Sequence, residues 1–221
     1  MAGLFRFRGF VARNGDLFLA AGIAAGAVYF FSGYFTPVHF DRERIEVRVT
    51  RGHIQVVGLY HYANTSRLPA VLTLRVPFPV DSDHPQPDWF ALYDSSEVGQ
   101  AGAEIVPVVQ GGDVSFRLVF RPREEKWVRL DYLQPSRVTR GRYLLTTTQP
   151  WRRPIGRADY VLRLPPDFTL LSSNYLVSPA PADGTWQAFT FSKTEFFPEH
   201  DWEFAWNHFR AEVAMREGDL P

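Results

Sequence analysis

Residues that could hold a metal ion or activate a nucleophile are few and poorly spaced in this sequence. The chain has 6 histidines and no cysteine, which excludes disulfides, thiolate metal sites, c-type haem attachment and a cysteine nucleophile. The histidines form neither an HExxH motif nor a pair four residues apart, and GxSxG, SxxK, Walker A and GxGxxG motifs do not occur. We therefore expect no catalytic residues, no cofactor and no metal.

Two groups of carboxylates provide the alternatives to that expectation. Asp81, Asp83 and Asp88 lie with His84 in the proline-rich loop at residues 78–88, where carboxylate oxygens could ligate Ca²⁺. The loop lacks the glycine and the final glutamate of the EF-hand pattern, so we favour a solvated acidic loop. Pairs such as Glu124 with Glu125, or Glu195 with Glu199, could serve a glycosidase. An anchored hydrolase is therefore our third hypothesis.

Charged and aromatic residues form two stretches that suit contact with a protein partner. Residues 137–157 contain six arginines and no acid, whereas residues 193–206 contain four acids, one lysine and several Trp and Phe rings. Arginine and aromatic side chains are enriched in interfaces, although the two stretches could also neutralise each other across neighbouring strands. The predicted partner-docking residues are Arg137, Arg140, Arg142, Trp151, Arg152, Arg153, Arg157, Trp202 and Trp206.

An apolar stretch near the N-terminus predicts a single transmembrane helix at residues 17–36. Residues 17–35, LFLAAGIAAGAVYFFSGYF, carry no charge, and nineteen helical residues span roughly 28 Å, close to the ~30 Å hydrocarbon core of a bilayer. The alternative is a cleaved secretory signal with a small-residue site at 25–27. The apolar run continues past that site, which favours an uncleaved anchor.

The flanks of this helix predict its orientation and a packing face. Arg6, Arg8 and Arg13 precede the helix, while the charges that follow it are nearly balanced. The positive-inside rule then places residues 1–16 in the cytoplasm or at its membrane interface, and the domain after the helix in the periplasm. The small residues predicted to pack against another helix are Gly22, Gly26, Ala21 and Ala25. The expected location is the inner membrane.

The rest of the chain predicts one mainly β domain at residues 38–207, an antiparallel β-sandwich. Apolar and polar residues alternate from Ile45 onward, and about twelve short strands follow one another with turns between them. The first three, up to residue 77, predict a meander, and Gly112-Asp113 predicts a hairpin. A strand is also expected at 143–148 and another at 201–207. Residues 208–221 form the predicted C-terminal tail, with a short helix to about residue 217.

Taken together, these features predict a non-catalytic accessory subunit of a larger integral membrane complex. A packing-competent helix, two charged aromatic stretches and no catalytic motif favour a role in docking partners over an enzyme. A respiratory or photosynthetic electron-transfer complex is one setting, and the partners would be integral membrane subunits and lipid, in a hetero-oligomer. The net charge of zero does not support binding to nucleic acid. The alternative is a periplasmic ligand-binding or sensory module for carbohydrate or lipid.

Overall fold

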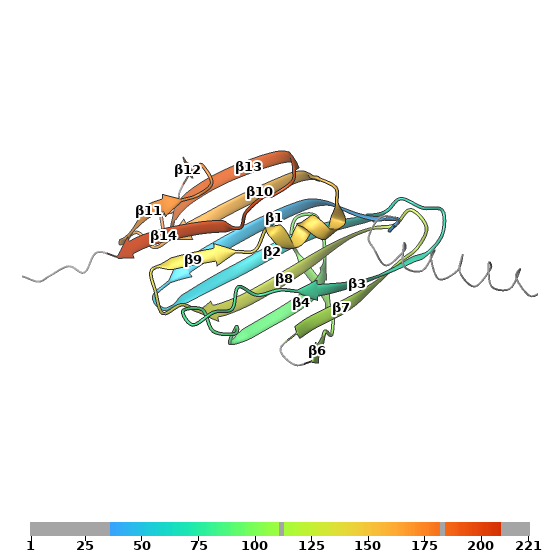
Figure 1. The fold of residues 1–221 in the computed structure, drawn as a ribbon, viewed down its shortest axis with the longest axis horizontal. Helices are drawn as coiled ribbons and strands as arrows, with labels where there is room; N and C mark the ends of the chain where they lie inside the picture. Colours follow the sequence, from blue (N-terminus) through green and yellow to red (C-terminus); the bar gives the residue numbers. More distant parts are fainter. Residues whose placement is uncertain (1–35, 111–112, 182–183, 209–221) are drawn as a thin grey trace, which may run out of the picture.

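A computed structural model describes residues 36–110, 113–181 and 184–208, and these residues form a two-layer β structure (Figure 1). The back layer is an eight-stranded sheet with the order β12-β13-β10-β1-β2-β8-β4-β5. Its strands are β1 Val38–Thr50, β2 His53–Asn64, β4 Trp89–Ser95, β5 Ala101–Glu104, β8 Glu125–Pro135, β10 Ile155–Leu164, β12 Ser178–Ala180 and β13 Gln187–Phe196.

The front layer consists of two separate three-stranded sheets, with the orders β11-β14-β9 and β3-β7-β6. Their strands are β9 Arg140–Tyr143, β11 Phe168–Ser173 and β14 Trp202–His208 in one sheet, and β3 Ala70–Val76, β6 Val108–Gln110 and β7 Asp113–Phe120 in the other. A 3₁₀ helix, η1, runs from Thr146 to Trp151 after β9. Among the described residues, no strand pairing joins the two small sheets, so the front layer is interrupted.

Both small sheets pack on the same face of the large sheet. On β1, Ile45, Val47 and Val49 are buried on this face, because side chains alternate between the two faces of a strand. The ring of Trp202 on β14 lies 5.8 Å from that of Tyr160 on β10, and Phe78, just after β3, lies 5.1 Å from Tyr132 on β8. The core is therefore a continuous layer between the large sheet and the front sheets.

The structure confirms the mainly β fold and its antiparallel sheets, with one exception. Strand β1 pairs with β10 in parallel, from Arg42 opposite Arg157 to Arg48 opposite Arg163. The predicted meander is wrong, because β2 pairs with β8 and β3 pairs with β7 in the other layer. The segment that follows β2 crosses from one layer to the other, which local alternation cannot reveal.

Other boundaries differ in places from the sequence prediction. The strand expected at 143–148 is wrong: β9 ends at Tyr143, and η1 begins at Thr146. The strand expected at 201–207 is confirmed as β14, and β6 pairs with β7 as the predicted hairpin requires. His208 belongs to β14, whereas the helix predicted beyond it lies outside the described residues. So do Ala21, Gly22, Ala25 and Gly26. Within the described part of the chain, no helix is long and apolar enough to cross a membrane.

Candidate functional site

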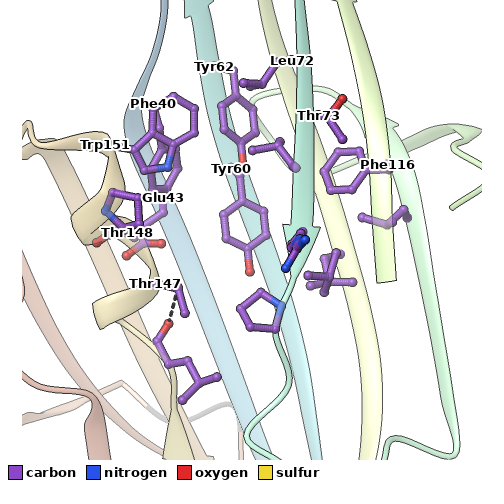
Figure 2. Close-up of a pocket in the computed structure, with 18 of the residues that line it drawn as sticks. Phe40, Glu43, Tyr60, Tyr62, Leu72, Thr73, Phe116, Thr147, Thr148 and Trp151 are labelled. Carbon is purple, nitrogen blue, oxygen red and sulfur yellow. Dashed lines mark hydrogen bonds between the residues drawn. The ribbon is translucent and has the colours of Figure 1, made fainter. Parts of the chain in front are cut away.

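A cavity of about 960 Å³ lies where the front layer is interrupted (Figure 2). Strands β1, β2 and β8 of the large sheet form its floor, β3 and β7 form one wall, and η1 with the end of β9 forms the other. Pockets that bind small molecules have volumes of about 300–1,000 Å³ and mostly apolar walls with a few polar groups. The size of this cavity is at the upper end of that range.

Glu43 on β1 places a carboxyl group at the cavity floor. A register shift between Phe40 and Arg42 inserts Asp41 as an extra residue, and such a bulge re-aims the side chains beside it. Phe40 and Glu43 both face the cavity as a result. Glu43 is only 2% exposed, and the Tyr160 hydroxyl donates a hydrogen bond to its Oε1. Burial raises the pKa of Glu43 to about 7, although this hydrogen bond opposes the shift.

Tyrosine hydroxyl groups surround Glu43 on neighbouring strands. Tyr60 on β2 and Tyr143 on β9 share a hydrogen bond of 2.8 Å between their hydroxyl oxygens, which joins the floor to the front layer. Burial raises the pKa of both phenols well above the ordinary range, and the charge of Glu43 raises it further. Tyr62 and Tyr132 also line the cavity and have pKa values raised by burial. These phenols are neutral hydrogen-bonding groups at physiological pH.

Three aromatic rings form an apolar surface beside Glu43. The ring centroids of Phe40 and Tyr62 are 5.3 Å apart, and Trp151 at the end of η1 lies 5.9 Å from each of them. Figure 2 shows Trp151 and Phe40 next to Glu43, with Tyr60 and Tyr62 on the adjacent strand. Aromatic groups at such distances pack favourably in tilted arrangements. This surface can bind the apolar or aromatic part of a ligand.

Strand β3 supplies the opposite wall over most of its length. Residues 71–77 all line the cavity, although successive side chains point to opposite faces of a strand. The cavity therefore runs along the edge of β3 that does not pair with β7, over roughly 20 Å at ~3.3 Å per residue. Arg75 and Arg117 are exposed and line the same cavity. The site thus combines an apolar surface, a buried carboxyl and two exposed guanidinium groups.

The predicted docking residues occupy three different environments. Trp151 lines the cavity. Trp202 and Trp206 are 0% and 3% exposed, so both are core residues that a partner cannot reach in this fold. The charged and aromatic composition of residues 193–206 predicts a contact surface, but Trp202 and Trp206 lie on the face of β14 that packs on the large sheet. Trp202 also donates a hydrogen bond of 3.1 Å from Nε1 to Ser173 Oγ.

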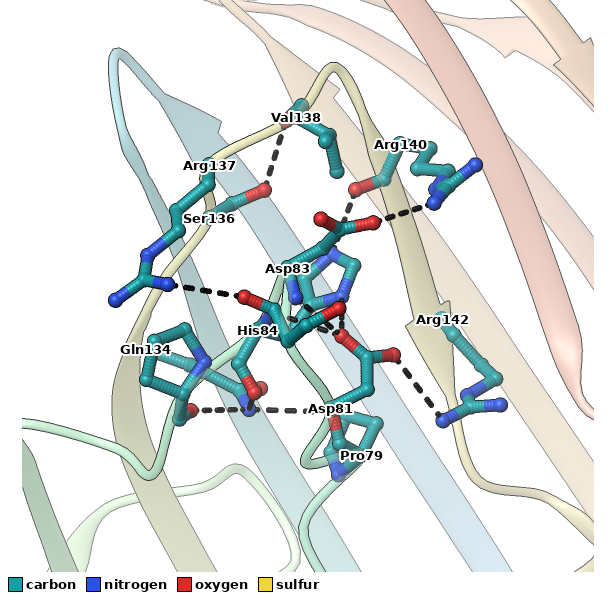
Figure 3. A network of polar contacts seen from close by, with 12 residues as sticks. Pro79, Asp81, Asp83, His84, Gln134, Ser136, Arg137, Val138, Arg140 and Arg142 are labelled. Atoms are coloured by element: carbon teal, nitrogen blue, oxygen red, sulfur yellow. Dashed lines mark hydrogen bonds and ion pairs between the residues drawn. The ribbon is translucent and has the colours of Figure 1, made fainter.

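The arginines before η1 bind the acidic loop of the same chain (Figure 3). Arg140 forms an ion pair with Asp83, Arg142 lies 3.6 Å from Asp81, and Arg137 donates to the Ser82 carbonyl oxygen at 3.1 Å. Arg140 and Arg142 are therefore neutralised by Asp83 and Asp81 of the same chain.

The same loop does not have the arrangement of a calcium site. Asp81 Oδ1 accepts hydrogen bonds from the backbone N–H of Asp83 at 2.9 Å and of His84 at 2.8 Å, and His84 Nδ1 lies 3.0 Å away. The described residues contain no group of three potential ligands placed to hold a metal ion. The carboxylates instead hold the loop against β9.

The remaining arginines lie beyond η1. Arg152 caps the end of η1 in a left-handed conformation, φ 52°, and Arg153 contacts His39. Arg157 on β10 binds Asp159, with Nε 2.8 Å from Oδ2. The six arginines are therefore distributed over a loop, two strands and the end of η1. Whether any of them also contacts a partner stays a prediction.

Sequence reasoning missed Glu43, Tyr60, Tyr143 and Tyr160 as site residues. One signal was present: extending the alternation of Ile45, Val47 and Val49 back by one step places Glu43 on the inward face. An acid at an inward position is unusual and marks a candidate site. The tyrosines gave no comparable signal, since they come from strands far apart in the sequence.

Comparisons with known proteins show a likeness in fold. The sequence matches no protein-family model, and it matches no curated protein. One similar solved structure is a provisionally assigned nutrient binding protein from Legionella pneumophila, with a TM-score of 0.57 and 14% identity over 76% of this chain and 66% of that one. Another is the M1 zinc metallopeptidase from Deinococcus radiodurans, with a TM-score of 0.44 and 14% identity over 76% of this chain and 42% of that one. This chain spans less than two thirds of either protein.

Proposed function

We propose that this protein binds a small, largely apolar molecule in the cavity between its two front sheets. The observation that carries the proposal is the cavity itself: about 960 Å³, lined by Phe40, Tyr62, Trp151 and the edge of β3, with a buried carboxyl at the floor. An apolar pocket with a few convergent polar groups is the usual form of a ligand site. The reaction chemistry of a hydrolase finds no comparable support, so the role is binding.

The accessory-subunit hypothesis remains a second proposal. Its helix-packing residues lie outside the described residues, and several of its arginines form intramolecular contacts with residues 81–83. A membrane anchor at residues 17–36 and a periplasmic location are compatible with either role, and they stay predictions. Ligand binding is favoured because it uses the groups that the fold brings together.

The experiment blocks the cavity from its mouth. Thr147 on η1 is exposed and lines the cavity, so Thr147→Trp should fill part of the space. Val119→Trp is the matched control, because Val119 is 58% exposed on β7 and does not line the cavity. The full chain, purified in lipid nanodiscs, is analysed by native mass spectrometry.

We expect a bound small molecule on the wild type and on the control, with at least tenfold lower occupancy on Thr147→Trp. A tenfold loss of affinity corresponds to about 1.4 kcal/mol of binding free energy, and a bulky side chain in the cavity should cost at least that much. Equal occupancy in all three proteins, or none on the wild type, would show that the cavity is not a ligand site.

A further inference from the structure

Resting on the proposed ligand-binding function, we propose that the ligand carries a protonated amine, which forms an ion pair with the Glu43 carboxylate at the cavity floor. The apolar part of the ligand would lie against Phe40, Tyr62 and Trp151. The ligand class is therefore an organic amine with an aliphatic or aromatic body.

The first argument is that Glu43 is a buried acid without a cationic side chain beside it. The residue is 2% exposed, and within the described residues no Lys, Arg or His nitrogen lies within 4.0 Å of its carboxylate oxygens. In the described part of the chain, only the Tyr160 hydroxyl bonds to it. A buried carboxylate is costly unless it is paired, and a ligand ammonium group would supply the missing positive charge.

The second argument concerns the phenol groups around Glu43. Tyr60 and Tyr62 come from β2, Tyr132 from β8, Tyr143 from β9 and Tyr160 from β10. All are neutral phenols: burial raises the pKa of Tyr60, Tyr62, Tyr143 and Tyr160, and the charge of Glu43 raises it further. Their ring faces attract cations. The surroundings therefore favour a positive group and provide none.

The exposed arginines at the rim point to the opposite charge and must be weighed against Glu43. Arg75 and Arg117 line the cavity but are exposed, so water and salt screen them. Charges in a buried site interact more strongly than charges at the surface. Arg42 and Arg44 flank Glu43 in sequence, but they lie on the outer face of the sheet near Glu97. We therefore expect the charge of Glu43, rather than that of the rim arginines, to decide which ligand charge the cavity prefers.

The test uses three probes that differ only in their polar group: 4-phenylbutylamine, 4-phenylbutanol and 4-phenylbutanoate. Binding to the full chain in nanodiscs is measured by isothermal titration calorimetry at pH 8, where Glu43, with a pKa of about 7, is mostly ionised. We expect the amine to bind about tenfold tighter than the alcohol, as for a charge-assisted hydrogen bond, and the carboxylate to bind weakest. Glu43→Gln should remove the preference for the amine while the alcohol binds as before.

A pH series on the wild type gives a second readout that needs no variant. The amine stays protonated below its pKa of ~10.4. A change in its affinity between pH 8 and pH 6 therefore comes from a group on the protein. Lowering the pH from 8 to 6 protonates most of Glu43, whose pKa is about 7, and should weaken amine binding by about fivefold. The alcohol, and the amine with Glu43→Gln, should show no such change.

The outcomes separate this inference from the proposed function. If the amine and the alcohol bind equally, or if Glu43→Gln binds the amine like the wild type, the amine assignment is wrong and the cavity remains a ligand site. If 4-phenylbutanoate binds tightest, the rim arginines select an anion and the assignment is again wrong. If no probe binds to either protein and the Thr147→Trp experiment also shows no occupancy, the ligand-binding function itself fails.

Discussion

Glu43 shows how a single residue can be favourable for binding and costly for folding. Its carboxyl is buried among tyrosines, and its pKa is raised from 4.5 to about 7. A group whose pKa is higher in the folded state contributes to stability below its unfolded pKa, and that contribution is lost as the pH rises through the folded pKa. The empty protein should therefore become less stable between about pH 4.5 and pH 7 because of this one side chain.

The first prediction at this scale is a stability comparison of wild type and Glu43→Gln at pH 4 and pH 8. Glutamine has a similar shape but does not ionise, so it avoids the cost of a buried charge. At pH 8 the variant should be more stable relative to the wild type than it is at pH 4. The difference in their free energies of unfolding should shift by about 3 kcal/mol in favour of the variant. Chemical denaturation of the full chain, followed by tryptophan fluorescence, measures it. The same difference at both pH values would mean that Glu43 does not titrate in this range.

At the scale of elements, the contact between β9 and β14 holds the front sheet beside the cavity. Strand β9 has four residues, yet it positions Tyr143 over the floor and leads into η1. Gly141 is needed where β9 crosses the core, because a Cβ there would lie 2.6 Å from Cζ of Phe204 and 2.9 Å from Cδ1 of Ile54. The absence of a side chain allows the close approach.

Gly141→Ala should therefore destabilise the protein by about 1–3 kcal/mol, as expected for overpacking of a filled core. Phe204→Leu removes the ring that the new methyl group would meet, so the alanine should cost less in that background. A double-mutant cycle on denaturation midpoints isolates the coupling between the two positions. If the effects of the two substitutions on stability are strictly additive, the Phe204 ring is not the group that excludes a side chain at residue 141.

For the whole molecule, the interrupted front layer explains why a core of this size contains a cavity. Six front strands cover the face of an eight-stranded sheet, and the gap lies between β3 and η1, above Tyr60 and Glu43. A continuous front sheet would cover these residues with backbone and side chains. The cavity is thus a consequence of layer topology rather than of any one strand.

At the same scale, we predict on which side of the membrane the β domain lies. Arg6, Arg8 and Arg13 precede the apolar stretch, so residues 38–221 should lie in the periplasm. Alkaline phosphatase fused after Pro221 should be active and a cytoplasmic reporter at the same place inactive. Reversing the three arginines to glutamate is the control, since it should reduce correct insertion. Activity of only the cytoplasmic reporter would contradict the predicted orientation.

The mainly β, antiparallel character of the domain follows from the amino-acid sequence alone, because period-two alternation is a local property of each strand. Ile45, Val47 and Val49 identify the inward face of β1 without reference to the rest of the chain. Turn residues likewise indicated the hairpin of β6 and β7. The lack of cysteine and of catalytic motifs was equally readable from the residues alone.

Strand pairing, and the side chains that lie between the two layers, could not be read from local sequence patterns. The parallel pairing of β1 with β10 and the transfer of β3 to the front layer depend on contacts between residues far apart in the sequence. For the same reason, Trp202 and Trp206 could not be assigned to the core from their spacing, since alternation marks two faces but not which one is covered. The surroundings of Glu43 depend on four strands that bring tyrosines to a carboxyl on a fifth strand, β1. No one of these strands carries that arrangement by itself.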